Sequence, residues 1–591
     1  MKQNPFFAGL PLAALLLTGC IDNKYDLDDL DTTTEIKVNN LVLPVNFDVV
    51  TLSDIITIDE DSKIKEIEID GKKVYAVTET GDFHSDPIDV PGFTAPAPSV
   101  PKGEATFALP DVNGVASRRA PRDATRYNIL SFTPQNVNFK AEGIDGSILD
   151  IEAIGCEPLQ ISLAFRADGV ADILDLSLEN LRFSFLKGLT IRNLPAGCSY
   201  DAASGILEVT EIDCGSDGVG TIAFMVDAID LHAGGASYDY AAHRLDYDSE
   251  INITEGYLAA SLKSSQAATE LPANIGLSVE TSVEALKATT FTGSLNYRLD
   301  GNGLNISPVD LSDLPDFLAQ EETNLRLANP QIYLQVNNPL GEDRLKCQTG
   351  MTLTAVRGDD RKSYSLDNNG VVEIGYDKAA GPYNFVLSPS MPSSPSADFA
   401  QGLEHVAFTG LSDVLSGNGL PKSIDIDLDD PQVPAQRVVD FRLDSSLPGI
   451  EGKYEFLAPL ALKGGDNGSV IVYRDRKDGW GDEDVEKITI EVLEIEADVT
   501  STIPLKAVLT ATPIDVDGNL MNVNVEGGVI EANAQNQHIV LRTTGVVKRL
   551  DGISFEAVVR PADGDQAIGP DQTIELRNVK ARVTGNYTTD F

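Results

Sequence analysis

The residue best placed to do chemistry is Cys20, which ends the run Leu17-Thr18-Gly19-Cys20. Lys2 supplies a short positive start, and an apolar segment from Phe6 leads through small residues to the cysteine. This three-part layout is that of a secretory signal, and its apolar part is too short to span a bilayer as a permanent helix. The alternative is an ordinary secretory signal in which Cys20 has no further role.

A second group of candidate residues lies in the acidic stretch 474–484. Calcium takes about six to eight oxygen ligands, including carbonyls from a tight glycine turn, and this stretch combines carboxylates with glycines on both sides. The candidate calcium ligands are Asp475, Asp478, Asp482 and Asp484. The stretch does not match the D-x-[DN]-x-[DN]-G loop, so a polar hairpin tip without a metal is the alternative.

Trp480 is the only tryptophan of the chain and lies in the same stretch. Sugar-binding surfaces usually place an aromatic ring against the sugar, with carboxylates or amides nearby to accept hydroxyl hydrogen bonds. Trp480 is therefore a candidate glycan contact. The alternative is an apolar plug at the end of a β-sandwich.

Four further cysteines remain after Cys20, without a C-x-x-C pair or a histidine spacing that would indicate zinc. Export permits disulfides. Cys198 and Cys214 flank a hairpin-like segment and are the best candidates for a pair. Small buried thiols are the alternative.

Motifs of enzymes are missing from the sequence. The five histidines are scattered, and there is no G-x-S-x-G elbow, H-E-x-x-H helix, P-loop or dinucleotide-binding glycine motif. Carboxylates are so abundant that a glycosidase pair would carry no sequence marker, and only its geometry would identify it. The sequence predicts a protein without enzymatic activity, with a glycoside hydrolase on a β scaffold as the alternative.

The elements that must position these residues are strands. Apolar and polar residues alternate from Ile36 to Val49 with a phase shift at Asn39-Asn40, which predicts a long strand with a bulge. Residues 67–77 predict a hairpin that turns at Asp70-Gly71. Short alternating runs separated by Asp-Gly and Asn-Gly steps follow from Tyr127 onward, whereas helical periodicity is nearly absent. We therefore expect an all-β protein of several antiparallel β-sandwich modules in tandem, with few short connector helices.

The length of 591 residues predicts about three or four domains. Proline-rich and arginine-bearing composition marks a linker before Tyr127. The predicted division is a signal peptide (1–19), an acidic tether (20–34), an N-terminal β region (35–93), a linker or loop (94–126) and three β-sandwich modules (127–300, 301–460 and 461–591).

The chain is strongly acidic, with 91 Asp and Glu against 45 Lys and Arg and a net charge of −46. Such a charge repels nucleic acid and keeps a protein soluble, so we expect no nucleic-acid partner. No segment after the signal approaches the length of a transmembrane helix.

The run Leu17-Thr18-Gly19-Cys20 resembles the lipobox of bacterial lipoproteins, and the acidic tether that follows resembles the export signal of surface lipoproteins of the Bacteroidota. The resemblance implies cleavage before Cys20 and acyl chains on its thiol and its new amino group. The whole chain is similar to large Bacteroidota surface lipoproteins of undefined function. This resemblance implies a lipid-anchored protein that is exposed on the outer membrane and contacts the membrane through its acyl chains.

The expected function is a non-enzymatic binding or structural role at the cell surface, with a glycan or a protein as ligand. One alternative is a glycan-capture lipoprotein, which would need an exposed aromatic ring at Trp480 or at a tyrosine. The other is a fimbrial or adhesin-type subunit, which would have a removable first strand, Glu35 to Val50, and cleavage near Arg118 or Arg126.

Overall fold

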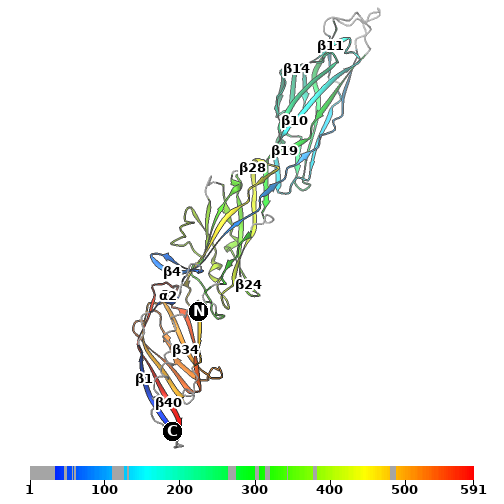
Figure 1. The fold of residues 1–591 in the computed structure, drawn as a ribbon. Helices are drawn as coiled ribbons and strands as arrows, with labels where there is room; N and C mark the ends of the chain where they lie inside the picture. Colours follow the sequence, from blue (N-terminus) through cyan, green and yellow to red (C-terminus); the bar gives the residue numbers. More distant parts are fainter. Residues whose placement is uncertain are drawn as a thin grey trace, which may run out of the picture.

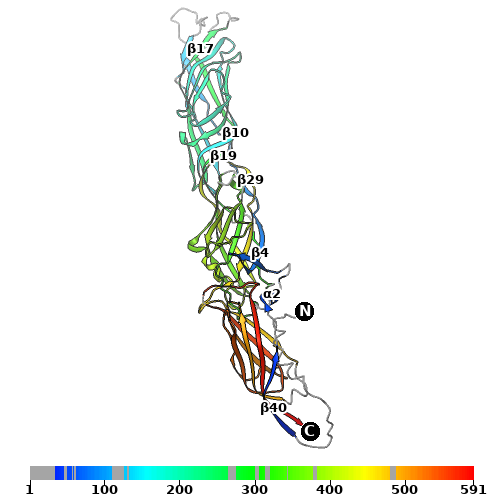
Figure 2. The same ribbon diagram turned by 90° about the vertical axis from the view of Figure 1, so that its left-hand side faces the viewer.

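A computed structural model of the 591-residue chain describes residues 33–45, 50–55, 58, 62–108, 125–129, 132–263, 274–299, 305–312, 314, 318, 320–341, 344–376, 382–479, 488–562 and 564–590. They form three β modules stacked end to end in a long rod (Figures 1 and 2). We name them the lower, middle and upper modules after their places in Figure 1.

The lower module contains both the first and the last of the described strands. One sheet runs in the order β1 (Thr33–Val45), β40 (Thr573–Asp590), β33 (Ile488–Ser501), β37 (Gln537–Lys548) and β35 (Asn524–Gly527), with β2 (Val50–Thr51) also on β40. The other runs in the order β32 (Ile471–Lys477), β38 (Leu550–Pro561), β34 (Leu505–Asp515) and β36 (Val529–Ile530).

The middle module places a seven-stranded sheet against one wing of a twelve-stranded sheet. The first contains β20 (Asn305–Ile306), β4 (Lys72–His84), β30 (Glu451–Pro459), β22 (Gln331–Asn337), β26 (Tyr383–Ser388), β27 (Leu403–Ala407) and β3 (Ile64–Ile69). The wing contains β28 (Ser423–Arg442), β23 (Cys347–Arg357), β24 (Asp360–Ser365), β25 (Val372–Ile374) and β21 (Val309–Asp310). The β26–β27 pair is parallel, whereas the other pairs of this module are antiparallel.

The upper module uses the second wing of the same twelve-stranded sheet. This wing contains β12 (Leu189–Arg192), β15 (Val219–Asp230), β10 (Ile148–Asp168), β19 (Leu286–Arg298), β18 (Asn274–Val283), β7 (Gly103–Ala108) and β6 (Thr94–Ala95). It faces a sheet of β13 (Cys198–Asp201), β14 (Ile206–Asp213), β11 (Leu174–Ser184), β17 (Arg244–Leu262), β16 (Ala236–Asp239), β8 (Thr125–Asn128) and β9 (Gln135–Glu142). Phe165 of β10 and Phe183 of β11 meet between the sheets, with ring centroids 6.2 Å apart.

The modules are nested in the sequence. The chain passes from β1 in the lower module through β3 and β4 in the middle module to the upper module, and then returns in the reverse order. The predicted N-terminal region 35–93 is therefore divided between two modules, because β1 pairs with β40 and β4 pairs with β30. The predicted linker 94–126 contains β6, β7 and the first residues of β8, which pair with strands of the upper module.

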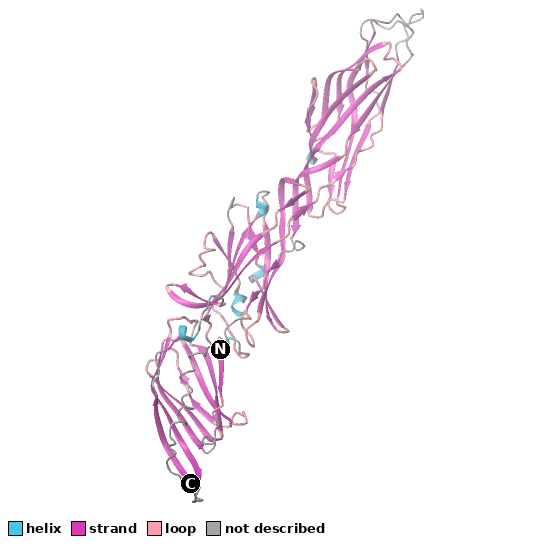
Figure 3. Ribbon diagram, viewed as in Figure 1, coloured by secondary structure: helices cyan, strands magenta, loops and turns pink. Residues whose placement is uncertain are grey.

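The predicted all-β fold is confirmed, and the helical elements of the described chain are short (Figure 3). They are α2 (Leu52–Ile55), η2 (Leu231–Ala233), η4 (Pro339–Gly341), η5 (Asp367–Asn369) and η6 (Thr409–Asp413). No helix among the described residues has the length and apolar character needed to cross a membrane.

Two local predictions are confirmed in detail. The register of β1 on β40 shifts between Val38 and Leu41, at the predicted asparagine bulge. The hairpin of β3 and β4 turns at Asp70 and Gly71, whose φ angles of 49° and 76° are both positive, as a type I′ turn requires.

Candidate functional site

The most extensive contact between two modules is the joint of the upper and middle modules, where β19 pairs with β28. The pairing runs from Thr290 opposite Arg442 to Arg298 opposite Gln432, so one continuous sheet crosses the joint. In the connections beside the joint, β5 (Ile88–Val90) pairs with β29 (Ser445–Leu447). The β19–β28 ladder therefore holds the joint through backbone hydrogen bonds.

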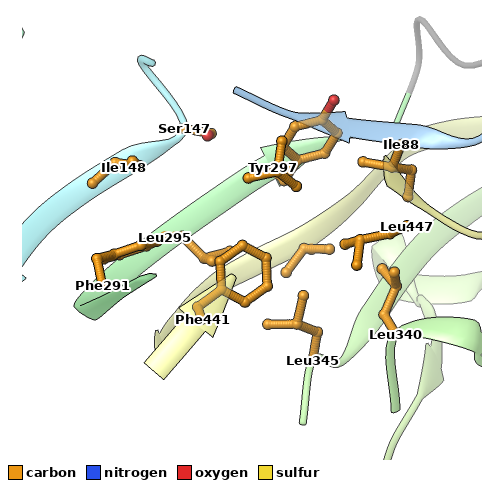
Figure 4. Close-up of a pocket in the computed structure, with 12 residues that line it drawn as sticks. Ile88, Ser147, Ile148, Phe291, Leu295, Tyr297, Leu340, Leu345, Phe441 and Leu447 are labelled. Carbon is orange, nitrogen blue, oxygen red and sulfur yellow. The ribbon is translucent and has the colours of Figure 1, made fainter. Parts of the chain in front are cut away.

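A small pocket lies inside this joint (Figure 4). Its walls come from both modules, and its volume is about 20 Å³, which is room for roughly one water molecule. The lining residues are Ile88, Val90, Ser147, Ile148, Phe291, Leu295, Tyr297, Leu340, Leu345, Val433, Phe441 and Leu447. Except for Ser147 and Tyr297 they are apolar, and ligand sites are usually at least ten times larger.

An aromatic pair packs inside the joint. Phe291 of β19 and Phe441 of β28 lie opposite each other in the ladder and meet edge to face, with ring centroids 5.8 Å apart. Both belong to one buried hydrophobic cluster that runs without a break from the upper into the middle module. Since the two modules share one core as well as one sheet, we conclude that they form a single packed unit.

A glycine allows the strands to approach at this place. A Cβ atom on Gly293 of β19 would lie 2.1 Å from the backbone oxygen of Asp150 in β10. A side chain at this position would push the two strands apart, because the contact is with backbone and not with a flexible side chain.

Charged side chains reinforce the outer surface of the joint. Arg437 of β28 reaches across β19 and donates to both carboxylate oxygens of Glu152 in β10, with Nε–Oε1 at 2.9 Å and Nη2–Oε2 at 2.6 Å. These hydrogen bonds lower the pKa of Glu152 and raise that of Arg437. Arg298 of β19 also pairs with Asp430 of β28, at 2.7 Å.

The chemistry available at the joint is limited. The Tyr297 hydroxyl donates to the carbonyl oxygen of Asp89 at 3.5 Å, and the apolar walls offer no further side-chain donor beyond Ser147. No nucleophile faces a base, and no set of carboxylates faces the pocket. The arrangement can hold two modules in a fixed relation, which is a structural role.

Half of the eight sequence-predicted site residues lie outside the described residues. This applies to Cys20, Trp480, Asp482 and Asp484. Of the remaining calcium candidates, Asp475 lies in β32 with only its backbone described, and Asp478 accepts a hydrogen bond from Arg476 at 2.8 Å. Within the described part of the chain no group of three His, Cys, Asp or Glu side chains is arranged to hold a metal ion.

The predicted disulfide between Cys198 and Cys214 is not formed, because both are free thiols in the structure. Cys198 lies opposite Val209 in the β13–β14 ladder, and Cys214 is five residues further along the chain. That offset is roughly 16 Å along a strand, whereas bridged cysteines have Cα atoms about 6 Å apart. Burial raises the pKa of the Cys214 thiol to about 11, which keeps it protonated.

Exposed aromatic rings do occur in the upper module. Tyr257 of β17 is 41% exposed, and the residues opposite it in the ladder are Asn128 of β8 and Glu179 of β11. Arg126 of β8 forms an ion pair with Glu179 at 2.6 Å. An exposed ring therefore stands between an amide and an ion-paired carboxylate on one sheet face.

One serine contacts a lysine in the middle module. The Lys463 ammonium donates to the Ser412 hydroxyl at 3.2 Å. Ser412 is buried in η6, so a substrate could not reach its hydroxyl. The contact is structural.

Sequence reasoning did not find the joint. Its only sequence signal is the length of the alternating runs 148–168, 286–298 and 423–442, which exceed the length of an ordinary strand. Such a run indicates a long strand but does not show which strand it pairs with.

Comparison with known proteins does not place the chain in a family. No protein-family model matches the chain, and no curated protein matches it in sequence. Among solved structures, the chain is similar to a Parabacteroides distasonis protein described as secreted, with 14% sequence identity and a TM-score of 0.33. The match covers 50% of this chain and 89% of that one.

Proposed function

We propose that this protein is a lipid-anchored, non-enzymatic rod that holds its upper module away from the cell surface. The observation that carries the proposal is the placement of β1 at the lower end of the rod, with Thr33 opposite Asp590 at the end of β40. Thirteen chain steps lead from Cys20 to Thr33, with twelve residues between them, and so short a tether reaches at most roughly 45 Å. An anchor at Cys20 would thus put the lower module next to the membrane and the upper module at the far end.

The packed joint supports this role, because a spacer has to keep its length. One sheet and one hydrophobic core cross from the middle to the upper module, so these two modules would project as a unit. The negative charge of the chain also suits a rod that projects from a surface, because anionic head groups repel an acidic protein and so hold it away from the membrane.

The test is metabolic labelling of cells with a fatty-acid analogue. Labelling of the wild-type protein should disappear in Cys20→Ser and persist in Cys198→Ser, the matched control at a half-buried thiol. Added protease should then remove the upper module from intact cells. Label retained in Cys20→Ser would refute the anchor, and full protection from protease would refute surface exposure.

A second candidate function, glycan capture, is favoured by the exposed Tyr257 ring with Asn128 and Glu179 beside it. An aromatic face with flanking hydrogen-bonding groups is the usual sugar-binding arrangement. Tyr257→Ala should then lose retention on a glycan array, whereas Tyr376→Ala, which removes an exposed tyrosine of the middle module, should keep it. Equal retention by both variants would refute a sugar site at Tyr257.

A further inference from the structure

The N-terminal strand is held by the C-terminal strand along nearly its whole length. The ladder of β1 and β40 runs from Thr33 opposite Asp590 to Val45 opposite Val579. After residues 46–49, β2 continues it with Thr51 opposite Thr573, the first residue of β40. The N-terminal segment is thus paired with both ends of β40, at 573–574 and from Val579 to Asp590.

The direction of β1 matters for how a pull would act on it. The strand enters at the lower end of the rod and leaves toward the middle module (Figures 1 and 2). A pull on the residues before Thr33, opposed by a load on the upper module, therefore acts along the strand. Hydrogen bonds of an antiparallel ladder are perpendicular to the strands, so such a pull loads them together and does not open them one after another.

Several chain connections and strand contacts join the lower module to the middle module. The N-terminal segment crosses once, between β2 and β3, and the rest of the lower module crosses between β31 (Ala461–Leu462) and β32. It also inserts β39 (Gln566–Ala567) beside β31. There the backbone of Ile568 accepts from Tyr75 at 2.9 Å and donates to Leu460 at 3.0 Å.

We propose that β40 is a clamp that passes tension from the anchored β1 to the whole lower module. While the ladder is intact, a pull on β1 is shared by all these crossings. Once β1 has slid off β40, the pull passes only through the single chain between β2 and β3, and the lower module no longer stiffens the base of the rod. The biological use of the clamp rests on the proposed anchoring at Cys20, but the clamp itself is a property of the folded chain.

The test is single-molecule pulling of the full mature chain, unacylated through Cys20→Ser, with Cys198→Ser to remove another thiol. One handle is attached before Thr33 and the other at Ser216, which lies in an exposed turn of the upper module. A disulfide between Lys37→Cys and Asn586→Cys, which are opposite residues of β1 and β40, locks the ladder. The control carries Lys37→Cys with Lys580→Cys, which is opposite Pro44 and too far along the strand to be bridged.

The chain with Cys20→Ser and Cys198→Ser alone should show a first rupture step as β1 leaves β40. That step should be lost in the oxidised locked variant, return after reduction and persist in the control. A first step that survives in a locked chain with a verified disulfide would overturn the clamp, as would cross-linking of the control in place of the locked variant. Neither outcome depends on lipidation, so failure of the clamp is distinguishable from failure of the anchor.

Discussion

At the scale of single residues, the ion pair of Glu152 and Arg437 reinforces the joint. The two hydrogen bonds from Arg437 lower the pKa of the Glu152 carboxyl. A carboxyl with a lowered folded-state pKa contributes stability that is fully present above its unfolded pKa and is lost as the pH falls through the folded one.

Arg437→Gln removes the arginine that donates both hydrogen bonds to the Glu152 carboxylate. The variant should be less stable than the wild type at neutral pH, and the difference should close as the pH falls through the lowered pKa of Glu152, because Glu152 is then protonated in both proteins. Denaturant unfolding at several pH values measures this difference in the free energy of unfolding. Arg182→Gln, which breaks a pair with Glu208 within the upper module, serves as control for an ion pair away from the joint. A difference that stays constant from neutral to acid pH would contradict the assignment.

At the scale of elements, strand β28 carries a buried and an exposed apolar residue two positions apart. Phe441 is 5% exposed in the joint, whereas Val439 is 62% exposed. Phe441→Ala should lower the free energy of unfolding by about 3–5 kcal/mol, since it removes a buried ring and leaves a cavity. Val439→Ala should change it by less than about 0.5 kcal/mol.

Chemical denaturation followed by aromatic fluorescence or circular dichroism compares the two variants. Because Phe441 packs against Phe291 of β19, the transition that weakens should include the upper as well as the middle module. A Phe441→Ala protein as stable as Val439→Ala would show that the joint is not a packed core.

The sequence predicts strands well and their partners poorly. The bulge at Asn39-Asn40 and the turn at Asp70-Gly71 are local features, because they depend on residues next to one another in the chain. The disulfide prediction failed because closeness in sequence does not place Cys198 and Cys214 at the same level of the sheet. The sequence also does not predict the joint, because Phe291 and its partner Phe441 lie far apart in the chain.

At the scale of the whole molecule, the nested chain path decides which predictions could succeed. Length and turn spacing predict several modules, but composition could not show that the first described strand pairs with the last one. The same path gives the rod its polarity, because one module holds both β1 and β40 and another lies at the opposite end.

The pairing of β1 with β40 also sets an order for folding during synthesis. Synthesis from the amino end makes β1 first of the described strands and its partner β40 last. The strands of the upper and middle modules are therefore complete before the lower module can form its β1–β40 ladder. Domains usually fold in the order in which they are made, and here the first strand has to remain without its ladder until the final residues arrive. A chain that stops before β40 therefore leaves the edge of β1 without its hydrogen-bonding partner.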